Sequence, residues 1–357
     1  MKLIIPTFNR SAKLHRTLEY YNSVRESINC EIIILDGSTD EHAIWNKKNV
    51  ELSEAISYFK FDSELPFLNR VLKFLESCPE DELIVLGNDE DVFLPSYIKD
   101  SETFMLDNLD YSSYIGRYIT LCRPILSLNR ISHFRDYITI NDIDMVEPYR
   151  RLTTLLTMVL VGCSPVFFSV RRNNQLIQSI KCQLQMDLES TQELVDQASL
   201  ALTGKIKFVD KVMILRDETN LGYRYYETRH DPNCYITAED LPRFKKVLLS
   251  QYASEGLSYS LDTIMDWWLP IKNGLSTLPG IAFTRHKNTY SSYRSLYQDN
   301  TFLEKIIRNI SKSGIITAQI LSWFFIKREL LRSENKTSIS IFLRKVKTHG
   351  KYSGSSK

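Results

Sequence analysis

The sequence predicts an α/β fold built on a parallel sheet, and three observations support this prediction. Short apolar runs at 2–5, 30–36 and 82–87 have the composition of buried strands. Segments with helical spacing of apolar residues, 11–27 and 66–77, lie between these runs. Strands that alternate with helices in this way form parallel sheets with right-handed crossovers. The chain has 357 residues, which is enough for one large domain or two.

Each element of this N-terminal part has a local justification. The first strand, KLII at 2–5, is expected to end at Pro6. The helix at 11–27 places its apolar residues on one face. The second strand runs into the turn sequence Asp36-Gly37-Ser38. A third and shorter strand is expected at 54–61.

The remaining elements are predicted from the same signals. Pro66 suits the first turn of the helix at 66–77, which leads into the strand at 82–87. The segment 151–170 is apolar and fits either a helix or a strand. Further elements are expected at 111–121 and 131–140 (strands), 184–203 (a helix that Gly204 ends), 205–218 (one or two strands) and 237–253 (a helix).

We expect three parts along the chain. Residues 1–220 form the domain that contains the sheet, and residues 221–348 form a helical region rich in aromatic and basic residues. Residues 349–357 have the composition of a disordered tail. Long apolar side chains alternate with Lys and Arg in 302–332, which fits a helix lying in a membrane interface. The same pattern also fits an amphipathic helix pair packed on the domain or on another subunit.

Composition disfavours several classes of protein. Residues 305–357 contain twelve Lys and Arg against two Glu, which leaves the rest of the chain acidic although the net charge is +2. An acidic main domain argues against nucleic acid as a partner. The six cysteines are scattered without a C-x-x-C pair, which favours a reducing compartment, and we expect a cytoplasmic protein. The N-terminal apolar run is too short for a signal peptide, and no apolar stretch reaches membrane-spanning length.

Polar side chains follow three of the expected strands, at the point where each strand ends. They are Thr7-Phe8-Asn9, Asp36-Gly37-Ser38 and Asp89-Glu90-Asp91. Parallel α/β sheets bind their ligands at the carboxyl ends of the strands, so these clusters predict a site. Paired carboxylates suit Mg²⁺ or Mn²⁺, which could neutralise a diphosphate leaving group. The alternative is a solvated acidic turn without a ligand.

The three motifs "IPTFNR", "IIILDGSTD" and "LIVLGNDEDVFLPSYI" together resemble the opening of a glycosyltransferase family 2 domain. The resemblance covers roughly residues 1–217 and is closest to a bacterial subgroup with P-T-x-N-R, L-D-G-S and D-D-D-F motifs. It implies a GT-A fold, in which a mixed and mostly parallel sheet flanked by helices binds a nucleotide-sugar, here with a helical C-terminal extension. This chain departs from the subgroup pattern at Glu90 and Val92.

The resemblance also implies roles for individual residues. Pro6 and Thr7 match the loop that lies against the nucleotide base, and Asp36 matches the acidic residue that contacts base or ribose. Asp91 would be the main metal ligand, and Asp89 would face ribose or metal. Asn9, within the first motif, is assigned to the same nucleotide-sugar site.

Three further residues are assigned with alternatives. Glu193 matches the general base that would deprotonate an acceptor hydroxyl, and Asp196 on the same helix is the second candidate. Arg216 matches a basic residue that could brace a diphosphate, although an ion pair with its acidic neighbours is an equal alternative. His230 is a candidate third metal ligand, and its alternative is a structural role.

The function that the resemblance implies is a metal-dependent, inverting glycosyltransferase with Mn²⁺ or Mg²⁺ as cofactor. It would move a sugar from a UDP-sugar to a hydroxyl of a glycan or lipid-linked acceptor in bacterial surface polysaccharide synthesis. The membrane-interface interpretation of 302–332 fits such an acceptor and would add peripheral contact with the inner membrane leaflet. A nucleotidyltransferase is one alternative, although its usual glycine-rich first loop is missing from "PTFNRSAK". A non-catalytic protein that binds a partner or a membrane is the other.

Overall fold

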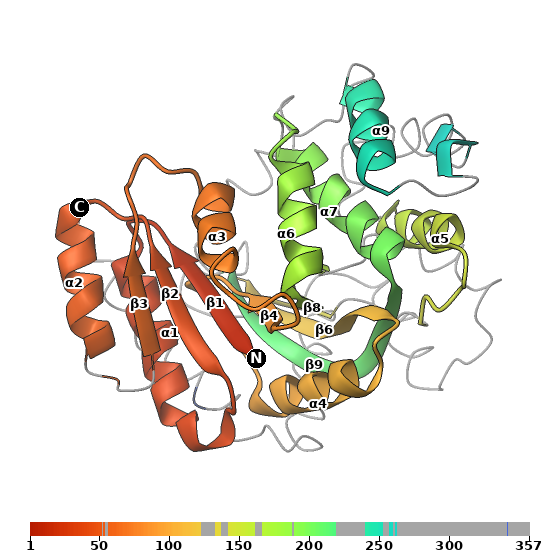
Figure 1. Ribbon diagram of the computed structural model, residues 1–357. Helices are drawn as coiled ribbons and strands as arrows, with labels where there is room; N and C mark the ends of the chain where they lie inside the picture. The colour runs from red at the N-terminus through yellow and green to blue at the C-terminus, as the bar shows by residue number, and fades with distance from the viewer. Residues whose placement is uncertain are drawn as a thin grey trace, which may run out of the picture.

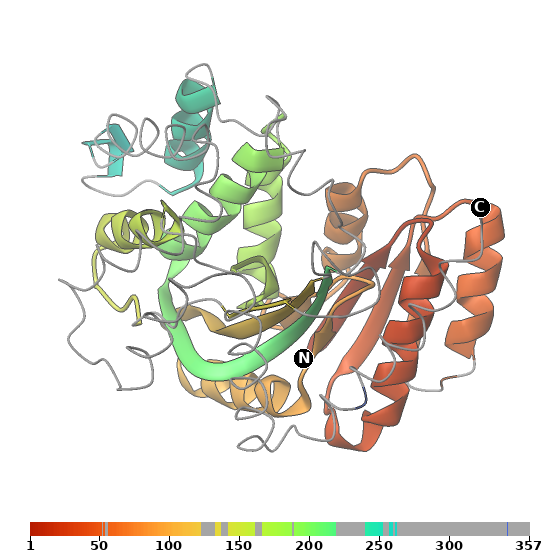
Figure 2. The ribbon, with the colours of Figure 1, turned by 180° about the vertical axis from the view of Figure 1, so that it is seen from behind.

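The computed structural model describes residues 1–51, 53, 56–122, 133–136, 142–160, 166–187, 189–218, 240–252, 257–259, 261–262 and 341. Within these ranges the strands form one sheet with helices on both faces (Figures 1 and 2). The strand order is β3-β2-β1-β4-β8-β6-β9-β5, and β7 pairs with β6 outside this path. Most paired residues are in parallel ladders. The predicted mixed and mostly parallel sheet flanked by helices is therefore confirmed.

The N-terminal half of the sheet is fully parallel. Its strands are β1 (Lys2–Thr7), β2 (Glu31–Asp36), β3 (Ile56–Lys60) and β4 (Leu83–Leu86). The helices that connect them are α1 (Ser11–Ser23), α2 (Asp40–Glu51) and α3 (Phe67–Leu75), and the 3-10 turn η1 (Arg25–Ser27) follows α1. Helix α2 was not among the expected elements. Only Ala43, Asn46 and Val50 of this helix are buried, so its sequence has little apolar periodicity to detect.

Strand β1 was expected to end at Pro6, but it continues through this residue to Thr7. The ladder between β1 and β4 stops at the pair Ile4 and Leu86. Proline at position 6 therefore lies beyond the end of β4, on the side where no acceptor awaits its missing N–H. On the other side of β1, the carbonyl of Thr7 accepts a hydrogen bond from the N–H of Gly37 at 3.1 Å.

Side chains alternate between two hydrophobic layers along each strand, as the pleat of a strand requires. Leu3 and Ile5 of β1 belong to the layer that packs on α1 and α4 (Pro95–Asp107). Ile4 belongs to the opposite layer, which packs on α3 and α6 (Asn173–Gln183). Because both faces are covered, the strands read as continuous apolar runs.

The C-terminal half of the sheet combines the two longest described strands, β6 and β9, with three short ones. Its strands are β5 (Val92–Phe93), β6 (Tyr111–Cys122), β7 (His133–Asp136), β8 (Val170–Arg172) and β9 (Lys205–Glu218). The ambiguous segment begins as helix α5 (Pro148–Leu160) and later forms the 3-10 turn η2 (Val166–Phe168). The helix expected from residue 184 starts later, as α7 (Glu189–Thr203), because residues 184–187 form the turn that follows the separate helix α6.

Strands β6 and β9 run parallel and curl around the helices α5 and α7 (Figure 1). Their register shifts at three places, near Ser113, Arg117 and Tyr118, and such bulges bend a strand pair. A side chain at Gly116 would lie 2.6 Å from the carbonyl oxygen of Lys211, so the bend leaves no room there for a Cβ. This curvature brings the end of β9 to β5, the strand that follows the acidic segment 89–91 in the sequence.

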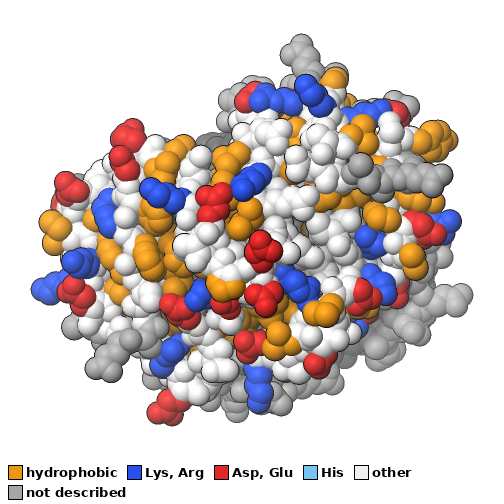
Figure 3. All heavy atoms as spheres, viewed as in Figure 1, with side chains coloured by type: hydrophobic (Ala, Val, Ile, Leu, Met, Phe, Trp, Pro, Cys, Tyr) orange, Lys and Arg blue, Asp and Glu red, His pale blue; other side chains and the backbone are white. Residues whose placement is uncertain are grey.

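Helix α9 (Asp240–Gln251) matches the helix expected at 237–253, and its residues Phe244, Val247 and Leu248 join the main core. Most of the region 221–348, with His230 and the segment 302–332, lies outside the described residues, as does the tail 349–357. Among the helices that the structure describes, none combines the length and the apolar character that crossing a bilayer requires. On the face shown in Figure 3, basic and acidic side chains are interspersed.

Candidate functional site

The sheet brings the three predicted polar clusters to one edge. Thr7 at the end of β1 pairs in register with Asp36 at the end of β2. The acidic segment 89–91 follows β4, the neighbour of β1 on its other side. A direct contact joins the first cluster to the third, because the hydroxyl of Thr7 donates a hydrogen bond of 2.8 Å to Oδ2 of Asp89.

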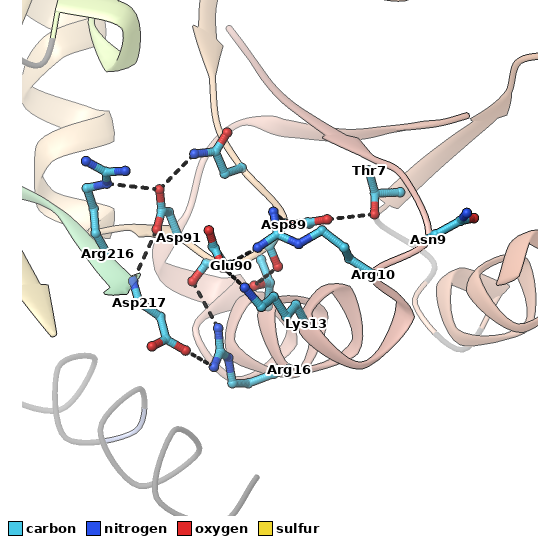
Figure 4. Close-up of polar contacts among 12 residues, drawn as sticks. Thr7, Asn9, Arg10, Lys13, Arg16, Asp89, Glu90, Asp91, Arg216 and Asp217 are labelled. Carbon is cyan, nitrogen blue, oxygen red and sulfur yellow. Dashed lines mark hydrogen bonds and ion pairs between the residues drawn. The ribbon is translucent and has the colours of Figure 1, made fainter. Parts of the chain in front are cut away.

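The two aspartates of the acidic segment are buried and turn in opposite directions (Figure 4). Asp89 faces Thr7 and the N-terminal end of α1. Its Oδ1 lies 3.0 Å from Nη1 of Arg10, but the geometry is not that of a hydrogen bond, so this buried oxygen accepts none. Asp91 faces the end of β9 instead. Its Oδ1 accepts from the N–H of Asp217 at 3.2 Å, and its Oδ2 from Nδ2 of Asn88 at 3.0 Å.

Arg216 lies beside Asp91 at the end of β9. Its Nε is 3.4 Å from Oδ2 of Asp91, and its guanidinium carbon is 5.1 Å from the ring centre of Phe168. The alternative expectation, a surface ion pair with Asp217 or Glu218, stays untested because the side chain of Glu218 lies outside the described residues. The structure therefore brings Arg216 together with Asp91, and its role at a diphosphate stays a prediction.

Burial shifts the ionisation of both aspartates in the same direction. It raises the pKa of Asp89 to about 6, against the opposing effects of the Arg10 charge and the Thr7 hydrogen bond. It also raises the pKa of Asp91 to about 6, against the opposing charge of Arg216. Because a cation stabilises ionised carboxylates, a metal ion between these residues would favour their charged form.

One face of α1 supplies cations to the acidic segment, and none of these cations was among the residues predicted for the site. Arg10 and Lys13 both contact the carboxylate of Glu90, and Arg16 contacts the carboxylate of Asp217 (Figure 4). Arg16 also donates to the carbonyl oxygen of Glu90 at 3.1 Å. The three-residue spacing of these cations, one turn of helix apart, was the available signal. It identifies a common face but does not reveal what that face meets.

Asp36 is completely buried, and protein groups already occupy both of its oxygens. Oδ1 accepts from the N–H of Ser38 at 2.7 Å. Oδ2 accepts from Nδ2 of Asn46 and from the hydroxyl of Tyr58, each at 2.8 Å. Asp36 thus shapes the turn after β2, and a direct contact with a ligand would require one of these donors to move.

Asn9 connects the loops that follow β1 and β2. Its backbone φ of 52° is in the left-handed region, which asparagine tolerates better than most residues. Its N–H donates to the hydroxyl of Ser38 at 2.8 Å, and its Oδ1 accepts from the N–H of Thr39 at 2.9 Å. Pro6, the other residue assigned to this loop, is buried within β1.

Arg70 of α3 belongs to the same edge and was also missed. Its side chain is only 5% exposed, and its Nη1 donates to the carbonyl oxygen of Thr7 at 3.1 Å. A Cβ at Gly37 would lie 1.5 Å from this Nη1, so the guanidinium occupies the space that the glycine leaves open. Burial lowers the pKa of Arg70, and the charge of Asp36 only partly opposes this. No carboxylate among the described residues forms an ion pair with it, which is unusual for a buried arginine.

The candidates for the general base have different environments. Glu193 is exposed near the start of α7. Asp196, one turn later, is buried and forms a two-point ion pair with Arg171, with Oδ1 to Nη1 at 2.5 Å and Oδ2 to Nη2 at 2.7 Å. It also accepts a hydrogen bond from Ser179 at 2.7 Å. A carboxylate occupied in this way is poorly placed to take a proton from a substrate, so the geometry favours Glu193 of the two.

The described residues contain no cluster of three His, Cys, Asp or Glu side chains that could hold a metal ion. Two features of the acidic segment nevertheless fit a hard cation. Asp89 has a buried carboxylate oxygen that accepts no hydrogen bond, and Asp91 supplies a second buried carboxylate two residues later. Divalent Mg²⁺ and Mn²⁺ commonly use one or two carboxylates and complete their shell with substrate phosphates and water. His230, the expected third ligand, lies outside the described residues.

No family model matches the sequence, and no curated protein resembles it closely enough to match. Solved structures do align with it. S. aureus TarS 1-349 is 13% identical, with a TM-score of 0.44 over 87% of this chain and 77% of that chain. The same TarS fragment in complex with UDP-GlcNAc is 14% identical, with a TM-score of 0.47 over 87% of this chain and 78% of that chain. Its complex with UDP is 13% identical with a TM-score of 0.44 and covers 87% and 77%. No residue of the site receives a role from alignments of this quality.

Proposed function

We propose that this chain is a metal-dependent glycosyltransferase of the GT-A type that uses a nucleotide-sugar, with UDP as the nucleotide. One observation supports this above all others. Two buried carboxyls, Asp89 and Asp91, lie at the carboxyl edge of a parallel sheet, where Thr7 and Arg10 border one and Arg216 borders the other. Such an arrangement suits a cation and a diphosphate together, because it offers anionic ligands for the first and arginines for the second.

The nucleoside end of the donor is assigned to the loops after β1 and β2. Pro6, Thr7, Asn9 and Asp36 are the residues that the sequence resemblance placed there, and the fold gathers all of them at one edge. Arg70 adds a buried guanidinium that can donate hydrogen bonds to the carbonyl oxygens of a base. For Asp36 to contact the nucleoside, the hydroxyl of Tyr58 or the amide of Asn46 would have to yield its place.

The metal is proposed to be held by Asp89 and Asp91. A divalent cation there would neutralise charge that develops on the diphosphate leaving group. The chain's own contribution is to bury both carboxyls and to place Arg216 at Asp91, where the guanidinium can also reach an anion. Arg10 would be displaced from Oδ1 of Asp89 by the cation while keeping its contact with Glu90.

The acceptor step is assigned to Glu193. Its carboxylate would remove the proton from an acceptor hydroxyl, which then attacks the anomeric carbon on the side opposite the diphosphate, so the configuration inverts. We propose as acceptor a glycan or a lipid-linked glycan of bacterial surface polysaccharide synthesis, at the cytoplasmic face of the membrane. The basic, apolar segment 302–332 is what suggests this peripheral contact.

Calorimetric titration of UDP into the protein, with and without Mn²⁺, tests the proposal. We expect the wild type to bind UDP only with Mn²⁺. In Asp91→Asn, Mn²⁺ should no longer change the affinity for UDP. The matched control is Asp100→Asn on α4, which removes an acidic side chain paired with Lys211 and away from Asp91. It should bind UDP as the wild type does.

Metal-dependent binding that survives in Asp91→Asn would contradict the metal site. If UDP fails to bind under any condition, the same titration with GDP, CMP and dTDP decides whether another nucleotide is the donor. Failure of all four would remove the nucleotide-sugar from the proposal. A panel of UDP-sugars follows once UDP binding is established, with release of UDP as the signal.

A further inference from the structure

Side chains along helix α1 form hydrogen bonds with the chain from Asp89 to Phe93. Besides the cations described above, the hydroxyl of Thr17 donates to the carbonyl oxygen of Asp89 at 2.8 Å. One turn later, the hydroxyl of Tyr20 donates to the carbonyl oxygen of Phe93 at 3.3 Å, and the N–H of Phe93 donates to the hydroxyl of Tyr21 at 3.0 Å. The path of the backbone from 89 to 93 is thus set by side chains of α1.

Arg16 differs from these neighbours because it also contacts β9. Its guanidinium contacts the carboxylate of Asp217 and, through the other terminal nitrogen, the carbonyl oxygen of Glu90. Both members of the ion pair are buried, with side chains 6% and 1% exposed. Neither side chain is therefore available to a ligand from solvent, and any influence on the site must pass through other residues.

That influence has a short route. Asp217, which Arg16 contacts through the side chain, uses its backbone N–H to hold Oδ1 of Asp91 at 3.2 Å. Arg216, the preceding residue, holds Oδ2 of the same carboxylate at 3.4 Å. The position of the Asp91 carboxylate thus depends on where the end of β9 lies, and Arg16 fastens this end to the acidic segment (Figure 4).

We propose that Arg16 is a positioning residue, which acts through Asp217 to hold the carboxylate of Asp91 in the orientation that binds a divalent cation and diphosphate. The inference rests on the proposed function for its ligand, but the coupling between Arg16 and Asp91 is a property of the protein alone. A guanidinium is needed because two partners on different segments are met by two nitrogens of one rigid plane, which a lysine ammonium cannot reproduce.

The alternative is that this ion pair stabilises the fold without any effect on the site. Buried ion pairs are weak evidence of net stabilisation, yet removing one partner is costly, so a loss of stability alone cannot distinguish the two views. The chain offers a matched control in Arg171. Its ion pair with Asp196 is equally buried, with side chains 3% and 5% exposed, and joins β8 to α7 away from the acidic segment.

The test compares Arg16→Met, Arg16→Lys, Asp217→Asn, the double variant Arg16→Met/Asp217→Asn, and the control Arg171→Met. Affinity for UDP in the presence of Mn²⁺ is measured at a temperature where thermal unfolding shows every variant to be folded. We expect Arg16→Met and Asp217→Asn each to weaken this affinity by about tenfold, since an uncompensated buried charge displaces the segment around it. The double variant should be no weaker than the single ones, because both changes break the same link.

Arg16→Lys should recover part of the lost affinity, while Arg171→Met should lose a similar amount of stability and bind like the wild type. Backbone hydrogen exchange measured by mass spectrometry gives a readout that needs no ligand. Peptides that cover 88–93 and 212–218 should exchange faster in Arg16→Met than in Arg171→Met. Equal exchange in these peptides, or wild-type affinity in Arg16→Met, would overturn the inference.

The outcomes also separate the inference from the proposed function. If the wild type binds no nucleotide but exchange in 88–93 rises in Arg16→Met, the coupling stands and the glycosyltransferase proposal fails. If the wild type binds UDP with Mn²⁺ and Arg16→Met binds equally well, the glycosyltransferase proposal stands and the role of Arg16 fails.

Discussion

The hydroxyl of Thr7 and the carboxylate of Asp89 are joined by a buried hydrogen bond of 2.8 Å that connects the ends of β1 and β4. Oδ2 of Asp89 is buried, so removing the Thr7 hydroxyl would take away a hydrogen bond that water cannot readily replace. The bond therefore contributes both to the stability of the sheet edge and to the charge state of the acidic segment.

We expect Thr7→Val to lower the free energy of unfolding by about 1–3 kcal/mol at neutral pH, the usual cost of leaving a buried polar group unsatisfied. Urea denaturation measures this difference. The control is Thr103→Val on α4, whose exposed hydroxyl donates to the carbonyl oxygen of Lys99 at 3.2 Å. It should change stability by no more than about 0.5 kcal/mol. Equal effects of the two substitutions would show that the Thr7 hydrogen bond contributes no more to the free energy of unfolding than an exposed one does.

Stability in the absence of divalent cations should fall as pH rises from about 4 to about 6. Burial raises the pKa values of Asp89 and Asp91 from an ordinary 3.8 to about 6. Within this window the folded protein holds more protons at these carboxyls than the unfolded chain does, so raising the pH favours unfolding. The loss is complete above about pH 6, where both carboxyls are ionised in either state.

Asp89→Asn and Asp91→Asn should each flatten this decline, because each removes one of the two titrating groups. Denaturation at several pH values measures the slope. Asp110→Asn is the control, since the hydrogen bond from Lys205 lowers the pKa of that exposed carboxyl, so its contribution has the opposite sign and lies below about pH 4. An unchanged decline in both segment variants would mean that other groups cause it.

Gly37→Ala should be destabilising through a single clash. The added Cβ would fall 1.5 Å from Nη1 of Arg70, which must then leave its buried position and its bond to the carbonyl of Thr7. Overpacking of this kind costs about 1–3 kcal/mol. In an Arg70→Ala background the space is free, so the same substitution should cost much less. Additive effects in this double-mutant cycle would contradict the close approach as the cause.

Glu193→Gln and Asp196→Asn should separate catalysis from stability on one helix. We expect Glu193→Gln to leave the free energy of unfolding and the affinity for UDP unchanged. Donor turnover, measured as the release of UDP, should drop by about 100-fold or more. Asp196→Asn instead leaves Arg171 as a buried cation without its carboxylate, at a cost of about 3–5 kcal/mol. Normal turnover in Glu193→Gln would exclude it as the general base.

The strands of the N-terminal half could be predicted because strands that are buried on both faces consist of continuous apolar residues. Leu3, Ile4 and Ile5 form an unbroken apolar run, since neighbouring residues face different hydrophobic layers. The acidic segment was also predictable, because its position after a buried strand is visible without a structure. Helix α2 was missed since it buries only three side chains and presents no clear apolar stripe.

The contacts that shape the site could not be predicted in the same way. Arg16 and Asp217 are 201 residues apart, and no local pattern links a cation on the first helix to the last strand of the sheet. Arg70 has no feature in the sequence that separates it from other helical residues, and its position above Gly37 depends on how α3 packs against the ends of β1 and β2. The curl of β6 and β9 depends on bulges, which the alternation of residues does not specify.

The distance in sequence between Arg16 and Asp217 has a consequence for how the protein folds. Strands β1 to β4 pair across short crossovers, whereas β9 must find β6 and β5 across a long intervening stretch of chain. Pairings between segments distant in sequence form slowly, because the loop-closure entropy is lost before the contacts compensate for it. A nascent chain that has emerged only as far as β8 can therefore assemble the N-terminal half of the sheet but lacks the end of β9 that orients Asp91. The carboxylate of Asp91 is therefore expected to reach its final orientation only after β9 has been synthesised, about three fifths of the way along the chain.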